Sequence, residues 1–136
     1  MAERRFVRKT ASDLVNVGVI TGPGGHVGAV WSEKMNPTGA NIRTTGMVMS
    51  HVWSIRRTWS EHLAEKHQGV SLVDDPRDMI GKIDGFILDD VTAISHYPTM
   101  VRPFLEAGIP TLVNRPFATS MAKGREMVET ADACNA

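Results

Sequence analysis

Short apolar runs alternate with segments of helical spacing along most of this chain. The apolar runs predict strands at Leu14–Ile20, Gly46–Ser50, Val70–Val73, Ile83–Leu88 and Thr111–Asn114. Apolar residues three or four apart predict helices at Gly25–Met35, Ser54–His67, Pro76–Ile80, Ser95–Ala107 and, from Thr119 or Ser120, to about Ala131. Strands that alternate with helices pair in parallel through right-handed crossovers. The pattern therefore predicts an α/β fold, with one doubly wound parallel sheet between two layers of helices.

Cap residues and prolines mark several of the expected helix ends. Asp75 followed by Pro76 is typical of a helix N-terminus, and Ser95 is the expected cap of the fourth helix. Pro103 lies inside that helix and is expected to kink it. We assign residues 1–13 to an N-terminal extension, 14–132 to a single domain and 133–136 to a tail.

The first apolar run ends in a glycine cluster, and a predicted helix follows it directly. A strand, a glycine turn and a helix in this order can hold the pyrophosphate of a dinucleotide. Gly22 can make the tight turn, and Gly24 lacks a Cβ that would keep a phosphate away from the backbone. The third glycine of this motif is expected at Val27 but comes one residue later, at Gly28. An ordinary turn with no ligand is the alternative.

Ligands of doubly wound sheets bind where the strands end at their carboxyl sides. In this chain those ends are expected at Thr21–Gly25, Ser50–His51, Asp89–Asp90 and Asn114–Pro116. Loops that are far apart in the sequence are therefore expected to meet in one crevice.

Three segments resemble the N-terminal domain of the Gfo/Idh/MocA oxidoreductases, which has a Rossmann-type three-layer α/β/α fold. Val17–Gly28 is similar to the glycine loop of that family. Asp84–His96 is similar to its fourth strand, the following loop and a histidine at the next helix start. Leu105–Ala118 is similar to its alanine-glycine helix end, the next strand and a Glu-Lys-Pro turn. The resemblance extends from Val15 to about Ala131 and implies that the chain binds NADP or NAD.

The resemblance and the loop pattern together indicate a set of cofactor-binding candidates. These are Gly22, Gly24, Gly25, His26, Val27, Ser50, His51, Asp89, Asp90, His96, Asn114 and Arg115. Arg115 stands where the family has a catalytic lysine and is the catalytic candidate. A guanidinium stays protonated near neutral pH, however, so Arg115 is a poor acid or base. Asp89 and Asp90 depart from the small neutral residues of the family, and their carboxylates would repel a pyrophosphate unless they face another group.

The second predicted strand bears on the choice between NADP and NAD. An NAD site places Asp or Glu near the end of this strand, where it binds the ribose 2′-hydroxyl. Between Lys34 and Ser60 there is no acidic residue, whereas Arg43, Arg56 and Arg57 are basic, and Ser50-His51 lies at the expected ribose position. This favours a 2′-phosphate, as in NADP, or no selection. The alternative is a solvated basic helix face.

Composition narrows the classes of function. With 136 residues and a net charge of zero, the chain has no global charge that suggests a nucleic-acid or membrane partner. The single cysteine, Cys134, supports no internal disulfide and no cysteine metal site, so the cytoplasm is the expected location.

We expect the NAD(P)-binding domain of an oxidoreductase that acts on CH–OH groups of sugars or cyclitols. The family's C-terminal substrate domain is absent from this sequence, so we expect it to be incomplete for catalysis alone. Apolar surface near the last helix and fifth strand is expected to support a homo-oligomer or a partner subunit. Two alternatives stay open: a non-catalytic nucleotide-binding sensor or subunit, and an interaction protein with an empty cleft.

Overall fold

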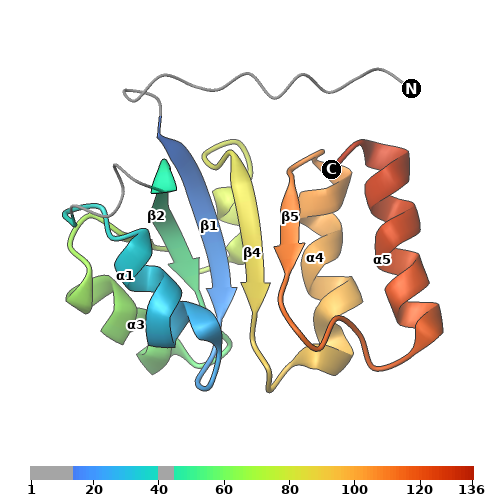
Figure 1. Ribbon diagram of the computed structural model, residues 1–136, viewed down its shortest axis with the longest axis horizontal. Coiled ribbons are helices and arrows are strands. Elements are labelled where there is room, and N and C mark those ends of the chain that lie inside the picture. The colour runs from blue at the N-terminus through green and yellow to red at the C-terminus, as the bar shows by residue number, and fades with distance from the viewer. Residues whose placement is uncertain (1–13, 40–44) are drawn as a thin grey trace.

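Five parallel strands form the centre of the molecule in the order β3-β2-β1-β4-β5 (Figure 1). The computed structural model describes residues 14–39 and 45–136. The strands are β1 (Val15–Thr21), β2 (Met47–Trp53), β3 (Ser71–Leu72), β4 (Gly85–Asp89) and β5 (Thr111–Val113). Each neighbouring pair is parallel. The predicted doubly wound α/β sheet is confirmed.

Helical segments follow each strand. They are the π-helix η1 (Val27–Trp31), α1 (Ser32–Lys34), α3 (Arg57–Lys66), the 3-10 helices η2 (Pro76–Met79) and η3 (Ile94–His96), α4 (Tyr97–Glu106) and α5 (Met121–Cys134). In Figure 1, α1 and α3 lie beside β1 and β2, whereas α4 and α5 lie beside β5. The side chain of Asp75 accepts the N–H of Arg77 and so caps η2, as the sequence predicts.

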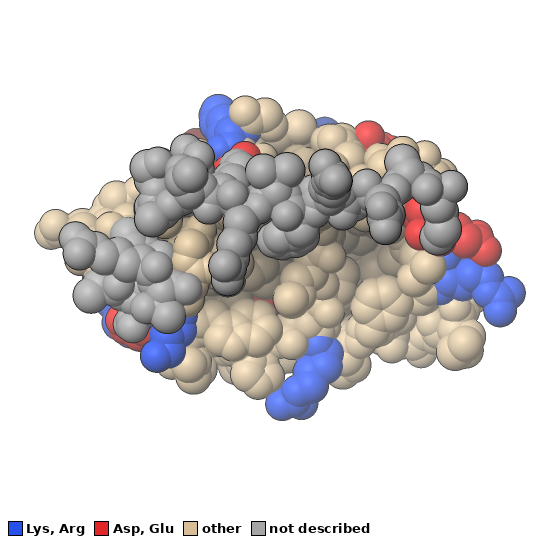
Figure 2. All heavy atoms as spheres, turned by 45° about the horizontal axis from the view of Figure 1, so that its top comes forward, with Lys and Arg blue, Asp and Glu red and all other residues tan. Residues whose placement is uncertain are grey.

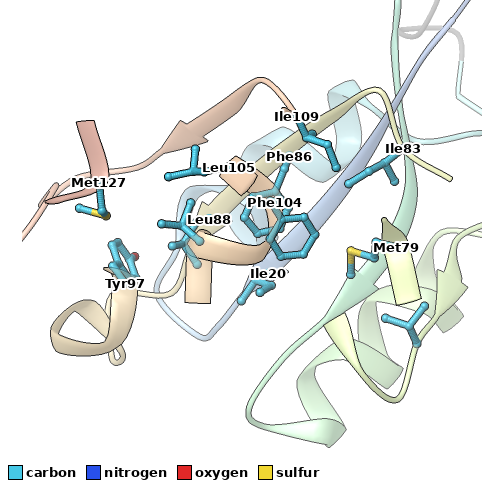
Figure 3. Packing of buried hydrophobic residues seen from close by; sticks show 12 residues of the cluster. Ile20, Met79, Ile83, Phe86, Leu88, Tyr97, Phe104, Leu105, Ile109 and Met127 are labelled. Carbon is cyan, nitrogen blue, oxygen red and sulfur yellow. The ribbon is translucent and has the colours of Figure 1, made fainter. Parts of the chain in front are cut away.

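Two apolar cores lie on opposite faces of the sheet, because successive strand residues point to opposite sides. On β4, Phe86 and Leu88 belong to one core and Ile87 to the other. The core of Phe86 is drawn in Figure 3, where the Phe86 and Phe104 rings stack with centroids 3.7 Å apart. The opposite core joins β1 and β2 to Leu63 of α3. Both layers of helices are thus held by buried apolar side chains.

Several element boundaries differ from the prediction. The first helix begins at Val27 as a π-helix, two residues later than expected, because the turn continues through Gly25 and His26. The helix predicted from Ser54 begins at Arg57. The cap predicted at Ser95 is wrong, since His96 is the N-cap of α4 and a short 3-10 turn precedes it. The last helix runs to Cys134 and so includes the first two residues of the predicted tail.

The second strand runs three residues beyond its predicted end. Ser50 and His51 interrupt the apolar run, yet both lie inside β2. Their polar atoms satisfy each other there, with Ser50 Oγ 2.8 Å from His51 Nδ1. His51 is paired in register with Gly18 on one side and Ser71 on the other. The strand continues because Val52 is fully buried between the layers.

Among the described residues that are visible in Figure 2, the Lys and Arg side chains and the Asp and Glu side chains lie in small groups around the rim. Among the residues that the structure describes, none of the helices has the length and apolar character needed to span a bilayer.

Candidate functional site

The loops after β1, β4 and β5 meet at one edge of the sheet, at the bottom of Figure 1. The turn after β1 is closed by a hydrogen bond from the Gly25 N–H to the Gly22 carbonyl, 3.2 Å long. Gly24 is exposed and has a φ of 83°, a backbone conformation that L side chains rarely adopt. The exposed turn and the start of η1 thus lie at the carboxyl edge, as the sequence predicts.

Asp89 is fully buried at the end of β4 and connects all three loops. Its Oδ2 accepts the Val27 N–H at 2.7 Å, and its Oδ1 accepts the Asn114 Nδ2 amide at 2.6 Å. The carboxylate therefore caps the first helical turn, which is the place where a phosphate binds in a glycine-loop site. The Asp89 carboxylate is therefore an internal anion, and it binds the N–H of Val27, a residue that the sequence predicts to bind the cofactor.

Asp90 is also buried but faces a different set of partners. Its Oδ1 accepts the Thr92 N–H at 3.0 Å and the Thr92 hydroxyl at 2.6 Å, which forms a local Asx turn. The Asp90 N–H donates to the Tyr97 hydroxyl at 3.0 Å. Burial of the Tyr97 ring, which outweighs the hydrogen bond from the Asp90 N–H, raises the pKa of Tyr97 to about 12. Tyr97 thus stays a neutral phenol at physiological pH.

The two aspartates also explain two of the glycines. A Cβ at Gly22 would lie within 3.0 Å of the Asp90 carboxylate, and a Cβ at Gly25 within 3.0 Å of the Asp89 carboxylate and backbone oxygen. Real Cβ atoms essentially never approach other atoms so closely. Gly22 and Gly25 are therefore required by the chain's own carboxylates. Gly24 has no such contact, since a Cβ there would meet only Val91 at 3.5 Å.

The late glycine of the motif, Gly28, has a separate packing role. A Cβ at Gly28 would lie within 3.0 Å of the Trp59 ring on α3. The third glycine of the dinucleotide motif normally permits close packing of the helix that follows the turn. Here Gly28 lets η1 approach α3.

His26 and Asn114 join the glycine turn to the end of β5. The Asn114 Nδ2 amide lies 2.8 Å from His26 Nδ1, and Arg115 Nη2 lies 3.5 Å from His26 Nε2. The His26 ring stacks on Trp31, with centroids 5.5 Å apart. Arg115 itself is exposed, and the peptide bond between Arg115 and Pro116 is cis. The structure therefore brings together His26, Val27, Asp89, Asn114 and Arg115.

The prediction that Ser50 and His51 lie at the ribose end of β2 is wrong. Both lie inside the strand, and β2 ends at Trp53, so the segment that reaches the edge is Ser54–Arg57. Burial of the ring, helped by the nearby Lys82 cation, lowers the pKa of His51. His51 is thus a sheet residue, and its partner is Ser50.

Two arginines stand just after β2 and differ in their partners. Arg57 donates to Glu61 at 2.9 Å and to Asp74 at 2.5 Å. Arg56 is exposed, and within the described part of the chain no hydrogen bond or ion pair occupies its guanidinium. Only Arg56 of this pair is available to a ligand without breaking an ion pair.

His96 is exposed at the start of α4, and no described contact joins its ring to Asp89, Asn114 or His26. The sequence prediction missed Thr92 and Tyr97 as partners of Asp90. The spacing of Asp90 and Thr92 was the available signal, since Asp bonds the backbone two residues on in an Asx turn. Over residues 14–39 and 45–136, we find no cluster of three histidine, cysteine or acidic side chains that could hold a metal ion.

The sequence matches no protein-family model and no curated protein. Solved structures do resemble the fold. The WlbA dehydrogenase from Chromobacterium violaceum, solved with NADH and UDP-GlcNAcA, matches 90% of this chain and 33% of its own, with a TM-score of 0.72 and 21% identity. A probable dehydrogenase from Thermotoga maritima matches 89% of this chain and 34% of its own, with a TM-score of 0.72 and 15% identity.

A third structure is biliverdin reductase from Synechocystis, solved with biliverdin and NADP+. It matches 88% of this chain and 35% of its own, with a TM-score of 0.67 and 17% identity. The chain spans about a third of the length of each of these structures. It therefore has the fold of the N-terminal part of such oxidoreductases, a five-stranded Rossmann-like sheet with flanking helices.

Proposed function

We propose that this chain is a dinucleotide-binding domain of an oxidoreductase, with NADP or NAD bound along the carboxyl edge of the sheet. The observation that carries the proposal is the turn at Gly24, which is exposed, has a positive φ and joins the central strand directly to a helical turn. Backbone of this kind lets a phosphate approach closely. The complexes of the similar structures with NADH and NADP+ support the same ligand class.

The end of β2 favours NADP over NAD. In the described part of the segment from Lys34 to Ser60 no carboxylate is available for a ribose 2′-hydroxyl, and the exposed guanidinium of Arg56 follows the strand. Arginine binds phosphate through paired N–H groups and stays charged at all physiological pH values. We therefore assign the 2′-phosphate to Arg56, and the ion pairs of Arg57 leave it a structural role.

The experiment is a fluorescence titration of NADPH and NADH against the Arg56→Ala and Arg57→Ala variants. Loss of one charge-assisted contact is expected to weaken NADPH about tenfold in Arg56→Ala and to leave NADH unchanged. Arg102→Ala, which removes an arginine paired with Glu126 between α4 and α5, is the control. Equal loss of NADPH and NADH, or a clear preference of the native chain for NADH, contradicts the assignment.

The reaction we propose for the complete enzyme is hydride transfer between the nicotinamide and a carbon that bears a hydroxyl, on a sugar or cyclitol. The complex of WlbA with UDP-GlcNAcA supports a sugar as substrate class. When bound, the dinucleotide supplies the hydride chemistry. The residues of this chain bind and orient it, and the permanent charge of Arg115 suits anion binding better than proton transfer.

A non-catalytic nucleotide-binding subunit is the second candidate. The observation that favours it is Arg115 at the position of the catalytic lysine of the family that the sequence resembles, because an exposed guanidinium can bind an anion but stays protonated near neutral pH. Substrate-dependent cofactor reduction distinguishes the two candidates.

We also propose that the chain associates with a second copy or another subunit. The exposed apolar side chains of Phe117, Met121 and Val128 line one hollow beside α5, whereas the exposed Leu112 lies on the other face of β5, beside Val15 and Trp31. Apolar patches of this kind mark interaction sites. Sedimentation analysis at high concentration is the test, and a well-behaved monomer counts against association.

A further inference from the structure

The His26 ring has two nitrogen contacts that cannot both be hydrogen bonds. A neutral imidazole has one N–H donor and one acceptor nitrogen. Asn114 Nδ2 lies 2.8 Å from His26 Nδ1, and Arg115 Nη2 lies 3.5 Å from His26 Nε2. The amide NH₂ and the guanidinium are donors only, so just one of these two ring nitrogens accepts.

Asp89 determines which contact is the hydrogen bond. A carboxylate only accepts, and Asp89 Oδ1 lies 2.6 Å from Asn114 Nδ2. The amide must therefore present its NH₂ group to Asp89, and the same NH₂ group then donates its second hydrogen to His26 Nδ1. The proton of the neutral His26 ring consequently resides on Nε2.

This tautomer leaves two donors facing each other at the edge of the site. The Nε2–H of His26 and the guanidinium of Arg115 are 3.5 Å apart, which is donor against donor. Stacking on Trp31 helps to hold the His26 ring in place. An anionic oxygen that accepts from both groups, one of them cationic, would relieve this contact between donors once the exposed Arg115 side chain turns toward it.

Two backbone N–H groups of the turn, of the kind that usually bind phosphate, already have acceptors within the chain. The Val27 N–H donates to Asp89, and the Gly25 N–H donates to the Gly22 carbonyl. We propose that His26 Nε2 and Arg115 form the anion-binding site of this chain and that they receive a phosphate oxygen of the ligand in place of the Val27 N–H. For a dinucleotide this oxygen belongs to the pyrophosphate, an assignment that rests on the proposed function. Asp89 and Asn114 are then positioning residues that set the His26 tautomer.

The first test is a titration with inorganic pyrophosphate at pH 8, followed by nitrogen-15 NMR of the histidine rings. The His26 signals are assigned by their loss in His26→Gln. We expect the Nε2–H tautomer in the free protein and a shift of the His26 signals on binding. Arg115→Gln changes an exposed residue and is expected to weaken pyrophosphate about tenfold, whereas the control Arg102→Gln leaves it unchanged.

The second test is Asp89→Asn. An amide at this position can donate to Asn114, which turns the Asn114 oxygen toward His26 and moves the ring proton to Nδ1. Nε2 then accepts from Arg115, and the anion site closes. We expect weaker pyrophosphate binding, although the loss of a negative charge would by itself strengthen it. If Asp89→Asn does not fold, the native tautomer and the Arg115→Gln titration decide alone.

The outcomes separate this inference from the proposed function. An Nδ1–H tautomer in the native protein, or equal pyrophosphate affinity in the native protein and Arg115→Gln, overturns the inference. Pyrophosphate binding that depends on Arg115, without any binding of NADPH, supports the anion site and refutes the dinucleotide function. Binding of NADPH that is unaffected in Arg115→Gln refutes the anion site and leaves the dinucleotide function standing. Absence of binding by both ligands refutes both.

Discussion

Replacing Asp89 with alanine tests whether its carboxylate holds the three edge loops together. The buried Val27 N–H would lose its charged acceptor, and an unpaired buried donor costs about 1–3 kcal/mol. Asn114 is only half-buried, so water can replace part of its bond to Asp89, and the net loss there is about 0.5–1.5 kcal/mol. We therefore expect Asp89→Ala to lower the free energy of unfolding by about 1.5–4.5 kcal/mol, a large share of the stability of a small domain.

Urea unfolding followed by circular dichroism measures this loss. Asp74→Ala is the matched control, because the Asp74 side chain is 89% exposed and its ion pair with Arg57 lies at the surface. Such pairs contribute little, so a change below about 1 kcal/mol is expected. Asn114→Ala and the double variant complete a cycle, in which the two losses should not add. A loss in Asp89→Ala as small as that of the control would refute the capping role.

Three further predictions concern Gly25, His67 and the reduction of NADP+. Gly25→Ala places a Cβ against the Asp89 carboxylate and should lower the free energy of unfolding, measured in urea, by about 1–3 kcal/mol. The control Gly85→Ala should lower it less, because a Cβ there meets only the Pro110 oxygen at 3.7 Å. Equal losses in the two variants would refute the steric explanation. Burial lowers the pKa of His67 below its usual 6.5, so the unfolded chain takes up the proton more readily. The contribution of neutral His67 to the free energy of unfolding is therefore complete above about pH 6.5 and is lost as the pH falls toward the pKa of the folded state. In urea unfolding at a series of pH values, His67→Phe should flatten this decline, whereas the control His62→Gln, at an exposed position, should not. The purified 136-residue chain should show no substrate-dependent reduction of NADP+ with sugars or cyclitols, because hydride transfer needs a positioned base and Arg115 stays protonated. Reduction well above background would contradict this.

The order of elements and the parallel sheet were predictable from the sequence, because apolar periodicity reports which side chains face a core. The glycine turn was also predictable at the carboxyl edge, since a strand, a turn and a helix follow each other without interruption. The end of β2 was not predictable by the same reasoning. Ser50 and His51 look like a strand end, but their mutual hydrogen bond lets them remain inside the sheet.

The contacts within the site depend on residues that are distant along the chain. Asp89 is hydrogen-bonded to Val27 and Asn114, which lie 62 and 25 residues away along the chain. No local sequence pattern therefore predicts that its carboxylate caps the first helical turn. In the sequence, the glycine turn predicts phosphate binding, whereas Asp89 and Asp90 argue against it because carboxylates repel phosphate. The structure resolves part of the conflict, because the aspartates occupy the space that Gly22 and Gly25 leave open.

Calorimetric titration of the folded chain with NADPH, and in parallel with NADH, tests the central proposal most directly. We expect one saturable site, with NADPH bound at least as tightly as NADH, because Arg56 follows β2 without a competing carboxylate in the described part of that segment. The absence of saturable binding of either dinucleotide to chain that unfolds cooperatively in urea would contradict it.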